Sequence, residues 1–449
     1  MNHPLLATAA LLLTLTTTPL LANDWPQWRG PSRDDLSKET GLLKQWPEGG
    51  PKKIWSYDKA GSGYSGFAIV GGKLFTMGTR DTETPTAAPA STANPAEPAA
   101  APPDPKKNPA PSPTANEILI CLDATTGQEL WTTKLGSVLG NNWGNGPRGT
   151  PCVDGDTVYT MGGEGTLVAA STKDGKELWR VTMESLGGKR PGWGYTESVC
   201  VDGKLVLCTP GGPKGTVAAL DKKTGQVVWQ SKDWTDGAHY SSIIPAKING
   251  QDQYVQRTDK NIAGLDAKTG AVLWKQPYPG KTAVIPTPIV QGNQIYVTAG
   301  YGVGCMSFTI EPGNQIKMLY DETASPGKVM KNHHGGVILL NDHVYGYSDG
   351  NGLVCQDFKT GQEVWAEKKA IQKGAISYAD GNFYFLEEGP GNVVLLEASP
   401  SAYVEKSRFK LDPQTTIRSP SGHIWTHPVI SNGRLYLRVQ DLIFCYAIK

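Results

Sequence analysis

A nine-residue phrase recurs along the chain, and its first full copy is Asp123-Ala-Thr-Thr-Gly-Gln-Glu-Leu-Trp131. Four further full copies follow, Ser171-Thr-Lys-Asp-Gly-Lys-Glu-Leu-Trp179, Asp221-Lys-Lys-Thr-Gly-Gln-Val-Val-Trp229, Asp266-Ala-Lys-Thr-Gly-Ala-Val-Leu-Trp274 and Asp357-Phe-Lys-Thr-Gly-Gln-Glu-Val-Trp365. Two weaker copies end at Tyr320 and Phe409, which place an aromatic side chain where the tryptophan belongs. The copies recur about every 46 residues, a period typical of folds that repeat one supersecondary unit.

Each period holds four short apolar segments separated by turn signals. In the third period we expect strands at 194–201, 204–210, 216–221 and 227–232. In the phrase itself, the Asp can accept hydrogen bonds from the turn, the Gly can adopt a positive φ, and the Trp can cover the junction with a neighbouring unit. Four antiparallel strands per period predict an all-β propeller of four-stranded blades. The 53 glycines and 33 prolines favour such a turn-rich chain over a helical one.

The two ends of the repeat region complement each other. After Phe409, residues 424–431, 434–439 and 442–448 supply three strands without a fourth. The phrase Lys53-Ile54-Trp55-Ser56-Tyr57 is an outer strand with no inner strands before it. We therefore expect the N-terminal outer strand to pair with the C-terminal three strands, which makes 52–449 a single eight-bladed ring.

Three other segments lie outside the regular repeat. Residues 1–22 contain an apolar stretch followed by polar residues, which predicts a secretory signal cleaved near Ala22, with an uncleaved membrane anchor as the alternative. Residues 23–51 form an aromatic leader, and residues 82–115 are a Pro/Ala-rich insertion that we expect to be a disordered loop in blade 1. We expect a periplasmic or secreted protein, monomeric and without a transmembrane span once the signal is cleaved.

Composition and missing motifs narrow the function. A net charge of +1 argues against a nucleic-acid partner. The seven cysteines are scattered, with no CxxC or CxxCH, which disfavours covalent haem and cysteine-rich zinc sites. There is no Gly-x-Ser-x-Gly elbow and no phosphate-cradling loop.

The repeated A-x-D-x-x-T-G-x-x-x-W phrase, its period and the closure resemble the pyrroloquinoline quinone (PQQ)-like β-propeller repeat, over about Lys52 to Lys449. The segment Trp25-Pro-Gln-Trp28-Arg-Gly-Pro31 also looks like the leader of exported bacterial members. The resemblance implies either a PQQ-dependent alcohol or sugar dehydrogenase or a scaffold similar to that of outer-membrane assembly. The chain departs from both, because it lacks the adjacent cysteines of the dehydrogenases and a lipid-anchoring Cys after the apolar stretch. We therefore expect a binding or scaffold protein of the bacterial envelope, with an envelope protein, small molecule or glycan as partner, and the dehydrogenase as the alternative.

Candidate binding residues collect where the chain enters the inner strands, around one mouth of the channel. They are Tyr64, Trp143, Asn145, Arg148, Trp193, Tyr195, Glu197, His239, Tyr240, His333, His334, Lys373, Trp425 and His427. The aromatic faces could stack on a planar or sugar-like ligand while Arg148 and Lys373 meet its carboxylates. The alternative is that these side chains fill the channel around ordered water.

Two sharper hypotheses use the same mouth. The imidazoles of His239, His333, His334 and His427, with the Glu197 carboxylate, would suit zinc or copper if they converge. His333 and His334 are not expected to point inward together from a regular strand.

The second hypothesis is PQQ with calcium. It would use Glu197, Asn145 and Arg148, with Asp349 as the candidate base. A third function, a histidine-rich metal-binding propeller, therefore stands beside the binding or scaffold protein and the dehydrogenase.

Overall fold

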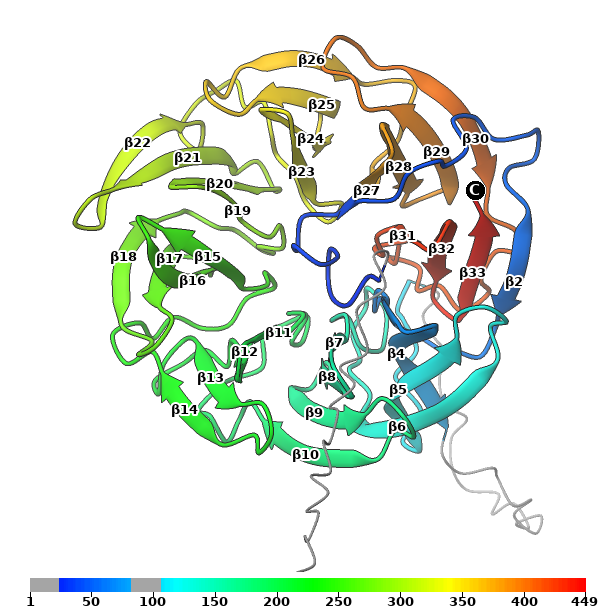
Figure 1. The fold of residues 1–449 in the computed structure, drawn as a ribbon, viewed down its shortest axis with the longest axis horizontal. Helices are drawn as coiled ribbons and strands as arrows, with labels where there is room; N and C mark the ends of the chain where they lie inside the picture. Colours follow the sequence, from blue (N-terminus) through cyan, green and yellow to red (C-terminus); the bar gives the residue numbers. More distant parts are fainter. Residues whose placement is uncertain (1–23, 82–105) are drawn as a thin grey trace, which may run out of the picture.

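The computed structural model describes residues 24–81 and 106–449. The predicted signal peptide and residues 82–105 of the insertion lie outside the described residues. The strands form eight sheets arranged around a central axis, as predicted (Figure 1). No helix in the described part of the chain is long and apolar enough to cross a membrane.

Seven blades use consecutive strands. They are blade 1, β3 (Ala68–Val70), β4 (Lys73–Asp81), β5 (Ala115–Asp123), β6 (Glu129–Ser137); blade 2, β7 (Cys152–Asp154), β8 (Thr157–Met161), β9 (Thr166–Ser171), β10 (Glu177–Thr182); blade 3, β11 (Cys200–Asp202), β12 (Leu205–Cys208), β13 (Ala218–Asp221), β14 (Val227–Gln230); blade 4, β15 (Ile244–Ile248), β16 (Gln251–Arg257), β17 (Asn261–Asp266), β18 (Val272–Pro277); blade 5, β19 (Ile289–Gln291), β20 (Gln294–Ala299), β21 (Gly304–Glu311), β22 (Gln315–Asp321); blade 6, β23 (Val337–Leu340), β24 (His343–Ser348), β25 (Gly352–Asp357), β26 (Glu363–Glu367); and blade 7, β27 (Gly374–Ala379), β28 (Asn382–Glu387), β29 (Asn392–Glu397), β30 (Glu405–Lys410). In each blade the four strands a to d run antiparallel from the axis outward.

Blade 8 closes the ring from both ends of the repeat region. Its inner three strands are β31 (Val429–Ser431), β32 (Arg434–Val439) and β33 (Leu442–Ala447), and its outer strand is β2 (Lys53–Tyr57). β2 pairs antiparallel with β33, placing Trp55 opposite Cys445. The predicted closure is confirmed.

The repeated phrase joins neighbouring blades. Asp123 Oδ1 accepts hydrogen bonds from the backbone N–H groups of Thr125 and Thr126, and Gly127 has φ 75°. A Cβ at Gly127 would lie 2.7 Å from the ring of Trp55, so the tryptophan of one blade lies flat on the glycine of the next. The same close approach recurs where Trp131 meets Gly175 and where later copies of the phrase meet their neighbours. Because no side chain would fit there, the glycine is needed for both its φ and its space.

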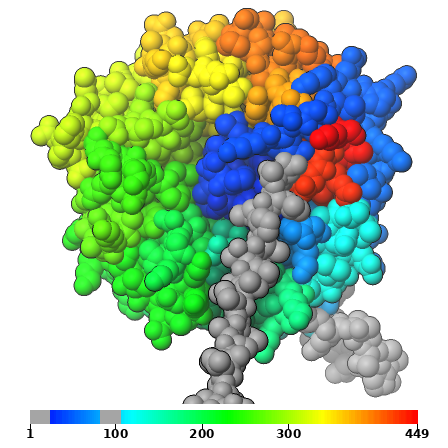
Figure 2. All heavy atoms as spheres, in the orientation of Figure 1, coloured from blue at the N-terminus to red at the C-terminus, as the bar shows by residue number. Residues whose placement is uncertain are grey.

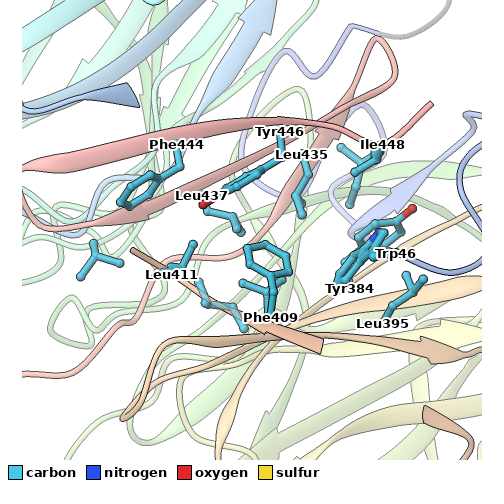
Figure 3. Close-up of a cluster of buried hydrophobic side chains, with 14 of the residues drawn as sticks. Trp46, Tyr384, Leu395, Phe409, Leu411, Leu435, Leu437, Phe444, Tyr446 and Ile448 are labelled. Atoms are coloured by element: carbon cyan, nitrogen blue, oxygen red, sulfur yellow. The ribbon is translucent and has the colours of Figure 1, made fainter. Parts of the chain in front are cut away.

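Apolar side chains fill the space between adjacent blades. Between blades 7 and 8 the cluster contains Tyr384, Phe409 and Tyr446, and Trp46 from the leader inserts among them (Figure 3). The Trp46 and Phe409 rings meet edge to face at 5.2 Å. The leader therefore extends the hydrophobic core of the propeller.

The inner strands are shorter than predicted. In blade 3 the regular strand covers Cys200–Asp202, whereas we expected residues 194–201. Near the axis, backbone N–H groups of the segments that precede the inner strands donate hydrogen bonds to side chains of neighbouring blades instead of to their own sheet. Ser198 N donates to Ser242 Oγ, and Thr150 N donates to Ser198 Oγ. These lead-in segments therefore form a ring of loops at the mouth.

The leader crosses the opposite end of the channel. It runs over the face that carries the a–b turns, where Leu42 N donates to Asp380 and Gly433 N donates to Glu39. Its short strand β1 (Leu36–Ser37) pairs parallel with β27 and gives blade 7 a fifth strand. The leader, coloured dark blue, lies over the centre of the ring in Figure 1, and its atoms cover the centre of this face in Figure 2.

Buried charges fix the leader in place. Arg29 Nε donates to Asp35 at 2.6 Å and Arg29 also donates to the carbonyl of Val337 in blade 6, while Arg33 donates to the carbonyl of Ser198 beside blade 3. The leader thus ties together blades on different sides of the axis. The sequence carries no repeat or motif that predicts this position of the leader.

Candidate ligand site at the channel mouth

A cavity of about 330 Å³ opens at one mouth of the channel. This mouth is formed by the d–a loops, each of which joins the outer strand d of one blade to the inner strand a of the next. Nine of the fourteen predicted residues line it: Tyr64, Trp143, Arg148, Trp193, Tyr240, His333, His334, Lys373 and Trp425. It is completed by Trp28, Thr196, Ser198, Ser242, Ala283, Ile285, Tyr301, Glu388, Ser421 and His423. All eight d–a loops contribute at least one lining residue. The ring of loops is therefore the wall of the cavity.

Aromatic rings form the wall in two connected groups. Trp143 meets Trp193 at 5.4 Å, and Trp193 meets Tyr240 at 5.7 Å, both edge to face. In the second group, Trp425 lies 4.9 Å from Tyr64 and stacks on His334 at 4.7 Å. The mutual packing holds these rings in place, and Trp143 remains 43 % exposed. The wall therefore presents rigid apolar faces to whatever enters.

Trp28 from the leader contributes to the cavity from the sealed side. Its indole N–H donates to Thr287 Oγ1 at 3.2 Å, and its ring lies 4.6 Å from the His427 imidazole. The segment from Trp25 to Pro31 resembles a family leader, but this resemblance did not place Trp28 in the site. Because the leader precedes the repeats, no repeat position could have assigned Trp28 to the channel.

Tyr301 and Glu388 were also missed, for a different reason. Both lie in b–c loops, between β20 and β21 and between β28 and β29. Since b–c and d–a loops emerge on the same face, a search of the b–c loops in the sequence would have found them.

Arg148 is the cation of the aromatic side of the cavity. Its Nη2 donates to the carbonyl of Gly144 at 2.7 Å, and its guanidinium lies 4.8 Å from the centre of the Tyr64 ring. Its Nε is buried and has no hydrogen-bond partner among the described residues. Burial lowers the pKa of Arg148, although the group keeps its charge at neutral pH.

Lys373 contacts an acidic and an imidazole side chain on the polar side of the cavity. Its Nζ lies 2.7 Å from Asp349 Oδ1 and 2.8 Å from His333 Nδ1. Burial, assisted by Lys373, lowers the pKa of His333 to about 4, and burial lowers the pKa of His334 as well. Both imidazoles are therefore neutral at physiological pH. Burial also raises the pKa of Glu388 to about 7, against the opposing effect of Lys373.

His333 and His334 both line the cavity, although we did not expect them to point inward together from a regular strand. The reason is the backbone, since residues 322–336 contain no strand and do not alternate sides. The two rings lie 3.6 Å apart.

The remaining five predicted residues lie outside the cavity lining. Asn145 binds residues of the insertion, accepting from Asn108 and donating to the carbonyl of Pro109. Tyr195 is buried and donates to the carbonyl of Pro210. His239 accepts a hydrogen bond from Val284 N.

Glu197 and His427 are buried beside the channel. Glu197 accepts hydrogen bonds from the backbone and the hydroxyl of Thr209, and burial raises its pKa to about 8 against these bonds. His427 Nδ1 lies 3.2 Å from Asp35, and its Nε2 lies 3.2 Å from the carbonyl of His334. His427 therefore connects the leader to the mouth.

The structure does not assemble the metal and cofactor ligand sets that the sequence suggested. Of the five candidate metal ligands, only His333 and His334 line the cavity. Within the described ranges no group of three or more His, Cys, Asp or Glu side chains is placed to hold a metal ion.

The donor set proposed for PQQ with calcium does not fit either. Glu197 and Asn145 are occupied by protein partners, and Asp349 is paired with Lys373. Glu388 is the carboxyl group that lines the cavity, and it was not among the predicted calcium ligands. All seven cysteines are free and buried, and none lines the cavity.

Comparisons with known proteins agree with the fold. No curated protein matches the sequence. BamB from Moraxella catarrhalis is 16% identical, with 74% of this chain and 89% of that chain covered and a TM-score of 0.51. Quinohemoprotein alcohol dehydrogenase from Comamonas testosteroni is 11% identical, with 95% and 80% covered and a TM-score of 0.57. The computationally designed Ika8 protein is 12% identical, with 88% and 100% covered and a TM-score of 0.55.

At these identities the solved structures establish a shared propeller fold and no shared activity. A family model is more specific. The model described as outer membrane protein assembly factor BamB matches residues 115–367, more than half of the chain, and the matched segment contains all five full copies of the repeated phrase. The PQQ-like repeat resemblance is thereby confirmed, and the chain belongs to the outer membrane protein assembly factor BamB family.

Proposed function

We propose that this protein is an exported binding protein of the bacterial envelope, and that its cavity at the d–a mouth takes a small organic ligand. The single observation that carries the proposal is the combination of rigid aromatic walls with polar atoms that have no protein partner. Buried polar groups are normally hydrogen-bonded, so unpartnered ones at a cavity wall indicate an outside partner. Three residues that line the cavity carry such buried atoms, Arg148 Nε, His333 Nε2 and His334 Nδ1.

The size of the cavity supports a small molecule. At about 330 Å³, it lies at the lower end of the range of about 300–1,000 Å³ that is typical of ligand pockets. Such a volume suits a ligand of one or two rings.

The fold and the family leave open whether the partner is a small molecule or a protein. The cavity favours the small molecule, because a flat protein docking surface would not require a deep aromatic pocket. The dehydrogenase alternative receives no support from the residues, since the expected calcium ligands bind protein partners. Export remains a proposal that rests on the predicted signal at residues 1–22 and on the family, and a monomeric state is proposed with it.

Tryptophan fluorescence tests the proposal directly, because Trp28, Trp143, Trp193 and Trp425 line the cavity. The purified chain would be titrated with glucose, glucuronic acid, benzamide, benzoic acid, and PQQ with Ca²⁺. Saturable quenching by a ring compound at a stoichiometry near one supports the proposal. Trp143→Ala should weaken that binding about tenfold, because it removes an exposed ring face.

Leu178→Ala is the matched control, since Leu178 is 53 % exposed on outer strand β10, away from the mouth. It should leave binding unchanged. Absence of saturable quenching by every member of the panel would overturn the small-molecule function. Tight binding of PQQ alone, dependent on Ca²⁺, would replace it with the dehydrogenase alternative.

A further inference from the structure

We infer that the cavity selects a ligand with a carboxylate attached to a ring, and that Arg148 receives the carboxylate. This inference rests on the proposed binding function and names the chemical class of the ligand. Three observations support it: two of the unpartnered atoms are donors, the cation Arg148 has no ion-pair partner, and the walls are flat and apolar.

The first observation concerns His333. Because the Lys373 ammonium can only donate, His333 Nδ1 must accept the 2.8 Å hydrogen bond between them. The neutral ring then carries its proton on Nε2, which is buried without a partner among the described residues. Arg148 Nε is likewise a buried N–H without an acceptor. Two residues that line one cavity therefore each carry a buried donor without an acceptor among the described residues, and an occupant with acceptor oxygens would match these donors.

The second observation is a comparison of cations. Lys373 is neutralised by Asp349 at 2.7 Å, and in the leader Arg29 is neutralised by Asp35 at 2.6 Å. Arg148 forms no ion pair with any described residue and has one carbonyl acceptor, Gly144. A carboxylate placed against it would gain charge-assisted hydrogen bonds without displacing a protein counter-ion. A neutral ligand would leave the guanidinium without an ion-pair partner.

The aromatic walls of the cavity indicate what the carboxylate of the ligand is attached to. The rings of Trp143, Trp193, Tyr240 and Trp425 surround the cavity with apolar faces. Such faces stack equally on an aromatic ring and on the C–H face of a pyranose. An aromatic acid and a uronic acid therefore share the chemistry that the cavity recognises, and experiment must separate these two sources.

Matched acid and neutral pairs test the inference. Glucuronic acid would be compared with glucose, and benzoic acid with benzamide, by tryptophan fluorescence. In the pair whose ring type fits, the acid should bind at least tenfold more tightly than its neutral partner, and its affinity should fall as salt is added. The pair that shows the preference identifies the source as saccharide or aromatic.

Arg148→Ala should reduce the affinity for the acid about tenfold or more and leave the neutral partner almost unchanged. Arg148→Lys should restore part of the preference, because it keeps the charge but not the planar donor geometry. The unfolding midpoint of each variant verifies that it folds. Arg180→Ala is the control, since Arg180 pairs with Glu177 on the exposed surface of β10 and should not affect either ligand.

The outcomes separate this inference from the proposed function. If the neutral compound binds as tightly as the acid, or if Arg148→Ala retains the preference, the inference is wrong while the binding function stands. If no compound of either pair binds, the proposed function fails, and the inference fails with it.

Discussion

The two ends of the channel are built from the same eight blades, yet they treat buried charge differently. At the end that carries the a–b turns, the leader brings Arg29 against Asp35, and Arg33 against the carbonyls of Ser198 and Val199 and the amide of Gln27. At the mouth, Arg148 has one backbone acceptor and no ion-pair partner among the described residues, while a buried Nε–H without a partner occurs in both Arg148 and Arg33. Arg29 has a carboxylate counter-charge, whereas Arg148 lines an open cavity without one, and this difference in counter-charge favours a charged ligand at the mouth. The comparison distinguishes a structural end from a functional one.

The largest expected effect concerns the sealed end. Arg29→Ala would leave Asp35 buried without its cation, and both side chains are at most 2 % exposed. The free energy of unfolding should fall by about 3–5 kcal/mol, as expected when one partner of a buried ion pair is removed. Chemical denaturation monitored by tryptophan fluorescence measures this loss.

Lys44→Ala is the control within the leader. Lys44 pairs with Asp380 at 2.7 Å but is 61 % exposed, so it should cost at most about 1 kcal/mol. Equal losses for the two variants would show that the leader is not anchored by its buried charges, and the contrast between the two ends would disappear.

The next effect concerns Trp28, which is part of the leader at the sealed end and also lines the cavity at the mouth. Trp28→Ala removes the contribution of the leader to the cavity and should weaken ligand binding about tenfold, because an aromatic contact is lost. Trp28→Phe keeps a ring while losing the hydrogen bond to Thr287, so it should retain most of the affinity. Isothermal titration of both variants with the ring compound that binds the cavity measures the difference in affinity. Unchanged binding in Trp28→Ala would mean that the mouth functions independently of the leader.

A smaller effect is expected from pH at the mouth. Glu388, whose pKa is raised to about 7, faces Lys373, Asp349 and Trp425. Above that pH it becomes negatively charged beside the ligand, so the affinity for a carboxylate should fall severalfold from about pH 6 to about pH 8. The neutral histidines do not titrate in this range, because the pKa of His333 is about 4 and that of His334 is lowered as well.

Glu388→Gln should remove the pH dependence of the affinity measured by titration at each pH. Between its ordinary pKa and about 7, the raised pKa also means that Glu388 in the folded state retains a proton that the unfolded state has lost. Glu388 therefore contributes less stability as pH rises from its ordinary pKa to about 7. A pH dependence that persists in Glu388→Gln would assign it to another group.

The smallest expected effect concerns a turn far from the mouth. Asp123→Ala removes the acceptor of two backbone hydrogen bonds in the c–d turn of blade 1 and should cost about 1 kcal/mol of unfolding free energy. The hydrogen bond from Thr126 lowers the pKa of Asp123, so this contribution is present at neutral pH and is lost as pH falls through the lowered pKa. Thr125→Ala keeps the backbone donor and should be neutral in the same denaturation experiment. Neither variant should change ligand binding.

The fold could be predicted from the sequence because its information is local and repeated. Asp123, Gly127 and Trp131 are close in sequence, and each copy of the phrase reports the same turn and the same junction. Closure followed from counting strands at the two ends, and the pairing of β2 with β33 confirms it. The inner strands were predicted too long, because hydrogen bonds between blades at Ser198 replace the sheet ladder there.

The candidate site could be predicted only in part. The positions before the inner strands identified nine lining residues, since repeat position determines which loop reaches the mouth. The same rule also selected Tyr195, Glu197 and His427, whose side chains are buried beside the channel and make structural hydrogen bonds. Position in the repeat gives the location of a backbone segment, but the direction of each side chain depends on its rotamer and its neighbours.

The sequence alone determined the blade, the number of blades and the way the ring closes, because these depend on short-range patterns of turns and apolar residues. Only the tertiary structure decided which end is sealed. The leader has no period to relate it to the blades, and its position depends on contacts such as Arg29 with Val337 and Trp28 with Thr287, over more than 250 residues of sequence. The tertiary structure also decided that Arg148 lacks a counter-charge while Lys373 has one, because an ion pair depends on distances in space that spacing along the chain does not specify.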